Sequence, residues 1–147
     1  MLFAADAGRR IDEAYVKTNK VKVTFRHFLV TDPNGESLWA ANAIECAGEQ
    51  NRFWDYHDKI AAESPGGRNS LTKANLKKFA ADIQLDVAKF NACLDSSKYA
   101  SVVQADIAEA QRLGINSTPT FILNGRRMNI ASLDFSEFAR TFDTLLK

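Results

Sequence analysis

Strand patterns near the two ends of the chain enclose a long stretch with helical periodicity. Residues 21–28, VKVTFRHF, alternate and are rich in β-branched and aromatic side chains, which is typical of a strand. Residues 120–123 form a second, short apolar strand pattern, and Asn124-Gly125 separates it from a return strand over residues 126–130. Asn-Gly is a strong hairpin signal because both residues tolerate positive φ. The order predicts an α/β domain with a helical insertion.

Apolar residues recur every three or four positions through most of the remaining chain, which predicts amphipathic helices. Asp86 is placed to cap one of them, and Gly114 is placed to end another. The expected helices cover residues 3–16, 36–50, 53–62, 71–83, 87–94, 99–113 and 134–146.

The composition is that of an ordinary soluble globular domain. The chain has 147 residues, of which 46% are hydrophobic and 25% charged, with a formal net charge of +1. This near-neutral balance removes the usual argument for a nucleic-acid or anionic-membrane surface. No apolar run approaches the ~20 residues that a membrane-spanning helix needs.

Two cysteines, Cys46 and Cys93, are the only ones in the chain. At this separation they cannot form a CxxC redox motif, and two ligands cannot make a zinc site. Both lie on expected helices with apolar neighbours, so two buried thiols or one disulfide between helices remain open. A catalytic role is disfavoured because neither lies at a helix N-terminus, where a thiolate is stabilised.

The loop at Thr118-Pro119 has two interpretations. A proline that begins a strand fits an ordinary trans bond, and only ~5–6% of X–Pro bonds are cis. Alternatively, a cis-proline would expose the backbone of Thr118 to an extended peptide. Position in the chain does not decide between them.

The other residues whose side chains could take part in catalysis or metal binding do not form a recognisable site. His27 lies in an expected strand and His57 in an aromatic helix, and a packed or partly exposed role is favoured for each. Acidic residues and histidines do not cluster as metal ligands, and no glycine-rich phosphate loop is present. We therefore expect no metal and no cofactor.

Four segments together resemble the DsbA-like family of thioredoxin-fold proteins. Residues 43–58, AIECAGEQNRFWDYHD, resemble the family's helical insert, and residues 90–99, FNACLDSSKY, resemble its next piece. Residues 113–125, LGINSTPTFILNG, resemble its cis-proline loop and following hairpin, and residues 21–28 resemble its second strand. The matches appear in the family's order.

The resemblance implies a thioredoxin-like fold interrupted by a helical domain, with thiol–disulfide exchange as the family activity. It divides the chain into a thioredoxin-like part, residues 1–33 and 113–147, and a helical insertion, residues 34–112. Thr118 and Pro119 would face an extended protein or peptide substrate, with Pro119 cis. Cys46 and Cys93 match cysteines of the insert that can bridge each other.

The beginning of the chain departs from the family pattern. Members have a strand and then a CxxC at the start of the first helix, but residues 3–8 contain no cysteine. The resemblance therefore implies an N-terminal truncation that removes the first strand and the attacking thiolate. Because that strand lies between those at residues 21–28 and 120–123, we expect poor stability, dimerisation or direct pairing across the gap.

Three functions follow from the resemblance. The first is a fragment of a disulfide oxidoreductase that is inactive alone, and the second is a non-catalytic peptide-binding module. The third and weakest is a glutathione-binding relative, which would need a nucleophile where this chain has Ala4, Ala5 and Asp6. No secretory signal is visible, although the resemblance implies a periplasmic or other extracytoplasmic location.

Overall fold

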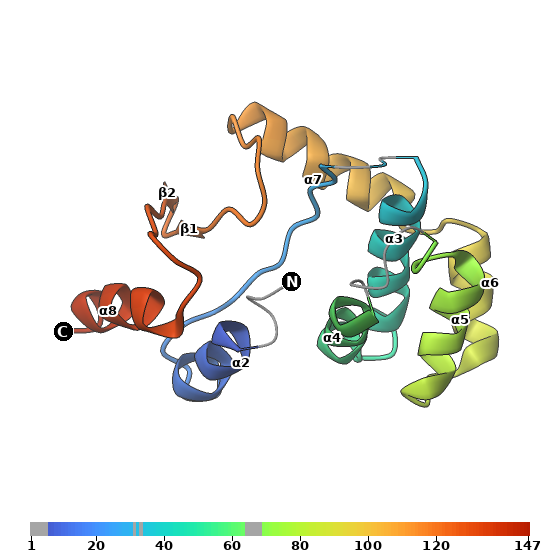
Figure 1. The fold of residues 1–147 in the computed structure, drawn as a ribbon, viewed down its shortest axis with the longest axis horizontal. Helices are drawn as coiled ribbons and strands as arrows, with labels where there is room; N and C mark the ends of the chain where they lie inside the picture. Colours follow the sequence, from blue (N-terminus) through green and yellow to red (C-terminus); the bar gives the residue numbers. More distant parts are fainter. Residues whose placement is uncertain (1–5, 31, 33, 64–68) are drawn as a thin grey trace. The chain divides into compact units, whose positions relative to one another are not determined.

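The computed structural model describes residues 6–30, 32, 34–63 and 69–147. The chain forms two compact units (Figure 1). Arg26–Thr118 form one, which we call the helical unit, and Met1–Phe25 with Pro119–Lys147 form the other, the hairpin unit. Compactness alone does not define domains, so the division predicted from the sequence, with an insertion at residues 34–112, stays a prediction.

The helical unit confirms the predicted run of helices. Helix α3 contacts each of the other helices of this unit, so it forms the centre around which they pack (Figure 1). The bounds are α3 Glu36–Gly48, α4 Phe53–Glu63, α5 Lys73–Asp82, α6 Val87–Asp95 and α7 Ala100–Arg112.

The helix ends are set by local hydrogen bonds. The Thr72 side chain accepts from the Asn75 amide at 3.3 Å at the start of α5, and the Asp86 carboxylate accepts from the Lys89 amide at 3.1 Å at the start of α6. The predicted Asp86 cap is therefore confirmed. After α7, Gly114 takes a left-handed φ of 68°, which suits a residue without Cβ that ends a helix.

Small and aromatic side chains fill the core of the helical unit. Tyr56, Leu76 and Phe90 are fully buried, and the Tyr56 hydroxyl donates to the Leu76 carbonyl at 2.7 Å. Burial of a hydroxyl group costs free energy unless the group forms a hydrogen bond. This hydrogen bond therefore offsets the cost of burying Tyr56 of α4 in the core. Alanines at positions 40, 43 and 47 allow the other helices to approach α3 closely.

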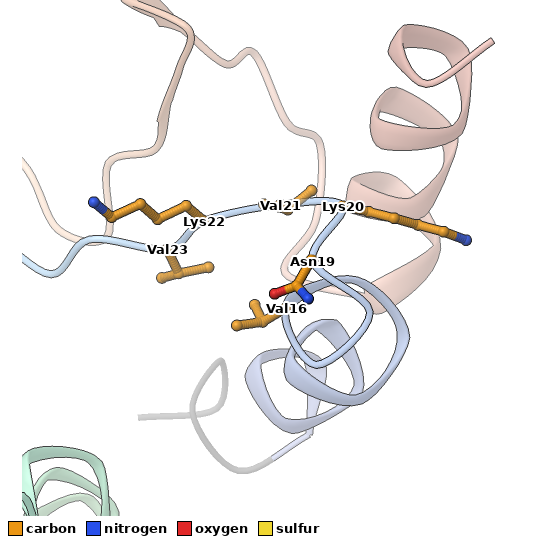
Figure 2. Close-up of a pocket in the computed structure, with 6 residues that line it drawn as sticks. All are labelled: Val16, Asn19, Lys20, Val21, Lys22 and Val23. Carbon is orange, nitrogen blue, oxygen red and sulfur yellow. The ribbon is translucent and has the colours of Figure 1, made fainter.

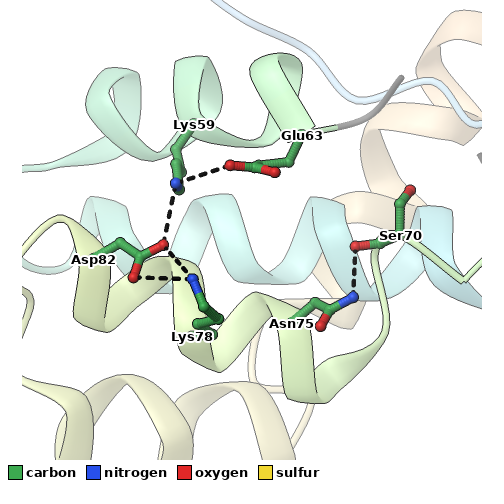
Figure 3. A network of polar contacts seen from close by, with 6 residues as sticks. All are labelled: Lys59, Glu63, Ser70, Asn75, Lys78 and Asp82. Atoms are coloured by element: carbon green, nitrogen blue, oxygen red, sulfur yellow. Dashed lines mark hydrogen bonds and ion pairs between the residues drawn. The ribbon is translucent and has the colours of Figure 1, made fainter. Parts of the chain in front are cut away.

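The outer faces of α4 and α5 are joined by charged side chains (Figure 3). Lys59 of α4 lies 2.9 Å from Glu63 and 3.1 Å from Asp82 of α5, while Lys78 lies 3.0 Å from Asp82. The Lys78 ammonium, followed by that of Lys59, lowers the pKa of the Asp82 carboxyl. Of these pairs only Lys59–Asp82 joins the two helices, and solvent-exposed pairs of this kind add little stability.

The helix predicted over residues 3–16 is present in the described part of the hairpin unit as two consecutive helical segments. Helix α2 covers Ala7–Ile11 and continues as a π-helical turn, η1, over Asp12–Val16, where the Lys17 amide donates to the Asp12 carbonyl at 2.9 Å. Residues 3–5 of the predicted helix lie outside the described residues. Asn19, shortly after this segment, has a left-handed φ of 57°.

Helix α8, Phe135–Leu145, packs against this N-terminal segment. Its buried residues Phe138 and Phe142 form a cluster with Ile11 and Tyr15, whose hydroxyl donates to the Asp143 carboxylate at 2.7 Å. Burial, followed by this hydrogen bond, raises the pKa of Tyr15. The hairpin unit thus has its own small hydrophobic core.

The predicted hairpin is confirmed, with shorter strands. Strand β1, Ile122–Leu123, pairs with β2, Arg126–Arg127, in an antiparallel register that sets Ile122 opposite Arg127. Asn124 and Gly125 take φ values of 48° and 79°, the paired positive values that an Asn-Gly turn supplies.

The predicted strand at residues 21–28 is wrong as a paired element. These residues run as an extended segment outside the β1–β2 pair, which makes up the sheet of the described residues. An alternating pattern favours extended backbone, but a strand exists only where a neighbour supplies its hydrogen bonds. The expected direct pairing with the 120–123 strand is likewise not seen in the described part of the chain.

Candidate functional site

The loop that joins the two units carries the residues predicted to face a substrate. Thr118 is the last residue of the helical unit and Pro119 is the first of the hairpin unit. Both are exposed, in a bend that leads into β1. Exposure makes the backbone accessible, while the cis bond at Pro119 and its contact with a ligand stay predictions.

A hollow of about 280 Å³ lies beside this loop in the hairpin unit. Its volume lies just below the ~300–1,000 Å³ that is typical of small-molecule sites. Pro119, Thr120 and Phe121 line one side, and residues 127–130 line the other.

A second, more open hollow of about 520 Å³ follows the extended segment after η1 (Figure 2). Val16 and Asn19 lie at one end of it, and residues 20–23 form its length. The side chains of Lys22 and Val23 leave the backbone in different directions, as alternate residues of an extended segment do (Figure 2). The backbone at the start of this segment is tied to the preceding helical turn, since the Lys20 and Val21 amides donate to the Tyr15 carbonyl at 2.9 and 3.1 Å.

Cys46 of α3 and Cys93 of α6 are joined by a disulfide. Their residues are 1% and 5% exposed, within the core of the helical unit. Thiol–disulfide exchange needs an attacking thiolate that reaches the sulfur, so this burial fits a structural bridge and not a redox centre. Since the chain has only these two cysteines, the 147 residues contain no free thiol in this structure.

His27 does not lie in a strand, contrary to the prediction, but is packed as expected. The residue is 3% exposed, and its Nε2 lies 2.8 Å from Oε1 of Glu45 on α3. Its backbone amide donates to Asp106 of α7 at 3.0 Å, and the Arg26 guanidinium donates to the same carboxylate at 2.9 Å. These bonds attach Arg26 and His27 to two helices of their own unit, α3 and α7.

Sequence reasoning missed Asp106. The signal was its position, because Val103, Asp106 and Ala110 follow one another at helical spacing and all are buried in α7. A carboxylate in an apolar stripe needs partners, and the Arg26 side chain and the His27 amide supply them.

His57 is also packed, as expected. It is 9% exposed, its ring meets Trp54 edge-on at 5.5 Å, and Nδ1 lies 3.1 Å from the neighbouring Asp58 carboxylate. Within the described residues, no group of three or more histidine, cysteine or acidic side chains is placed to hold a metal ion. In the same part of the chain, no helix is long and apolar enough to cross a bilayer.

Comparison with known proteins matches this chain to a family along almost its full length. A family described as Thioredoxin matches residues 2–144. A probable disulfide bond formation protein D of Bacillus anthracis is 26% identical over 141 residues, which is 94% of this chain and 64% of that protein. The chain belongs to the DsbA-like thioredoxin family.

Other relatives of this family member carry a different name. Na(+)/H(+) antiporter NhaA 3 of Salinispora tropica is 31% identical over 125 residues, covering 85% of this chain and 19% of that protein. An NhaA antiporter of Herminiimonas arsenicoxydans is 37% identical over 89 residues, covering 60% of this chain and 14% of that protein. The chain thus spans a fifth or less of these antiporters.

Family membership gives the fold its class. The chain has an α/β thioredoxin-like fold with a helical insertion, in which β1 and β2 form the sheet of the described residues. As a member of a disulfide oxidoreductase family, it contains an exposed Thr118-Pro119 loop and a buried disulfide. The CxxC of the family is absent from the 147 residues.

Proposed function

We propose that these residues form the substrate-facing loop and helical insertion of a DsbA-like thiol:disulfide oxidoreductase, and that they catalyse no exchange by themselves. The observation that carries this proposal is the state of the cysteines. Family membership implies thiol–disulfide exchange, yet Cys46 and Cys93 are both bonded to each other in a buried disulfide.

Thiol–disulfide exchange requires two reactive thiols, and the 147 residues do not supply them. In exchange, a thiolate attacks one sulfur of a substrate disulfide, forms a mixed disulfide and releases the other sulfur as a thiolate. A second thiol then attacks the mixed disulfide and frees the substrate. In the proposed protein both thiols belong to a segment beyond these 147 residues, while Thr118 and Pro119 hold the substrate backbone.

Turnover of a disulfide substrate tests this proposal. We expect the 147-residue chain to accelerate reduction of insulin by dithiothreitol no more than its Cys46→Ala/Cys93→Ala variant does. A protein translated from any in-frame upstream sequence that encodes a CxxC should accelerate it. Turnover by the 147-residue chain that depends on Cys46 and Cys93 would contradict the structural role of the bridge.

A non-catalytic peptide-binding module is the second candidate, and the exposed Thr118-Pro119 loop favours it. Binding of a cysteine-free unfolded protein, followed by fluorescence anisotropy, should survive Cys46→Ser/Cys93→Ser and weaken in Pro119→Ala. Unchanged binding in Pro119→Ala would remove the loop from the site.

Glutathione binding is the weakest candidate, and calorimetry without a heat of binding would eliminate it.

The partners and location follow from the same proposal. The proposed partner is an extended protein or peptide at the Thr118-Pro119 loop, with a second copy of the chain or a further N-terminal segment as the alternatives. Size-exclusion chromatography distinguishes a monomer from a dimer.

The disulfide fits an oxidising, extracytoplasmic compartment. Sodium–proton exchange is not proposed, because the match covers so little of the antiporters.

A further inference from the structure

Residues 22–24 of the extended segment have backbone groups without partners in the described part of the chain. Their amides and carbonyls form no hydrogen bond there, although the Lys20 and Val21 amides just before them are bonded to Tyr15. All three residues are exposed, and Val23 is 45% exposed. An extended backbone with such donors and acceptors is a template on which a further strand can pair.

Alternation along the segment decides what its edge and its faces offer. In an extended chain, alternate residues direct their amide and carbonyl groups to the same edge, so Lys22 and Thr24 share an edge. Their side chains share one face, and the side chain of Val23 lies on the other. Val23 lines the hollow of about 520 Å³ together with Val16, and Figure 2 shows both on the same side of the segment. One face therefore has an apolar hollow.

Lys22 contributes an uncommitted positive charge to the other face. Its ammonium has no ion pair within the described residues, whereas Lys17 pairs with Asp12 at 3.2 Å. The hairpin unit as a whole carries nine Lys and Arg residues against six Asp and Glu residues. Two copies of this unit would repel each other, so the charge favours an acidic partner over a second copy of the chain.

We propose that residues 22–24 dock an extended segment of another protein, which pairs antiparallel with them and carries an apolar residue followed by an acidic one. The apolar residue lies opposite Val23 and enters the hollow beside Val16. The acidic residue lies opposite Lys22, where directly opposed side chains have Cβ atoms ~4.5–5.5 Å apart and can form an ion pair. This docking goes beyond the proposed function, because it does not use the substrate-facing loop.

Cysteine-free heptapeptides test the docking by fluorescence anisotropy with the full 147-residue chain. The parent probe is a labelled Ser-Thr-Thr-Val-Glu-Thr-Ser amide, in which valine and glutamate are the docking pair. We expect it to bind about fivefold more tightly than the version with glutamine in place of glutamate, the size of an exposed ion pair. It should bind about tenfold more tightly than the version with serine in place of valine, through lost apolar burial. High salt should reduce the first difference.

N-methyl groups on the probe test the strand pairing itself. In the antiparallel pair, the glutamate of the probe exchanges both backbone hydrogen bonds with Lys22, so its amide points toward the protein, whereas the amide of the valine points away. N-methylation at the glutamate should abolish binding. N-methylation at the valine is the matched control and should weaken binding much less. Equal losses from the two modifications would overturn the strand pairing.

Two lysines of the protein provide matched charge variants. Lys22→Gln should abolish the preference for glutamate over glutamine. Lys20→Gln removes the same charge two residues earlier, where the side chain leaves the segment in a different direction, and it should keep the preference (Figure 2). Equal effects of the two variants would indicate general charge attraction and overturn the assignment to Lys22.

The Pro119→Ala variant separates this docking from the proposed function. The parent probe should bind Pro119→Ala as tightly as it binds the unaltered chain. Loss of binding in Pro119→Ala would place the probe at the substrate-facing loop and overturn docking at residues 22–24. If no probe binds, the docking is wrong and the proposed function is untouched. A dimer that forms although no probe binds would identify a second copy as the occupant and would likewise overturn the acidic partner.

Discussion

The two units of this chain complete their backbone hydrogen bonds in different ways. The helical unit does so largely within each helix, and side-chain contacts and one disulfide join its helices. In its described residues the hairpin unit has strands β1 and β2, of two residues each, and an extended segment at residues 21–25 that lies outside their sheet. The comparison teaches that the α-helical insertion is locally complete, whereas the thioredoxin-like part depends on non-local partners.

The largest expected effects come from the same truncation made in each core. Phe90 in the helical unit and Phe138 in the hairpin unit are 0% and 1% exposed. Phe90→Ala and Phe138→Ala should each lower the free energy of unfolding of their own unit by about 3–5 kcal/mol, through lost burial and the cavity left behind. The two clusters share no residue.

Separate probes reveal which unit has responded. Both tryptophans, Trp39 and Trp54, lie in the helical unit, so fluorescence in urea reports on that unit alone, and amide exchange in α8 reports on the other. Phe90→Ala should shift the fluorescence midpoint, and Phe138→Ala should shift only the exchange of α8. A common shift of both probes would show that the chain unfolds as one cooperative unit.

Removing the disulfide should have the next largest effect, confined to the helical unit. Cys46 and Cys93 close a loop with a sequence separation of 47. On the chain-entropy account, Cys46→Ala/Cys93→Ala should cost up to about 4 kcal/mol of the fluorescence-monitored stability. The wild-type chain should show no reactive thiol before reduction. Two thiols that react in the folded, unreduced protein would contradict the bridge.

Local signals explain what the sequence could predict. The caps at Asp86 and Gly114 and the Asn124-Gly125 turn depend on neighbours within a few residues, and each formed as expected. The alternation of residues 21–28 is equally clear and predicts a strand, but the structure shows extended backbone there without a strand assignment. Whether that backbone becomes a strand depends on a partner remote in sequence, which periodicity does not contain.

The features of the candidate site also fall into those that the sequence predicts and those that depend on contacts between distant residues. Exposure at Thr118-Pro119 agrees with the loop assigned by family resemblance, but neither the proline isomer nor a ligand follows from it. The disulfide and the Asp106 contacts join residues that lie far apart in the sequence, so spacing alone left the first open and missed the second. Pairwise contacts of this kind require the fold.

Two glycines offer a matched comparison of local strain in the two units. Gly114 and Gly125 have φ values of 68° and 79°, and a Cβ at either would meet nothing within 4 Å. Alanine at each should therefore cost about 1–2 kcal/mol from backbone strain alone. Fluorescence should detect Gly114→Ala, and exchange of the hairpin amides should detect Gly125→Ala. Asparagine, which tolerates this φ, should recover part of the loss, and an equal loss with asparagine would point to a steric cause.

The smallest expected effect is a shift in an alkaline titration of the helical unit. The Tyr99 hydroxyl donates to Glu49 at 2.7 Å, which is the main reason that the pKa of Tyr99 is raised to about 12. Because the folded pKa exceeds the ordinary value of 10.0, this contact favours folding below pH 10 and is lost as the pH rises through 12.

In a Tyr15→Phe/Tyr56→Phe background, tyrosinate absorbance should follow Tyr99 alone. Glu49→Gln should then lower its pKa toward 10, whereas Glu109→Gln, at an exposed glutamate paired with Arg112, should leave it unchanged. Equal shifts in both variants would mean that general charge, and not the Glu49 hydrogen bond, sets the pKa of Tyr99.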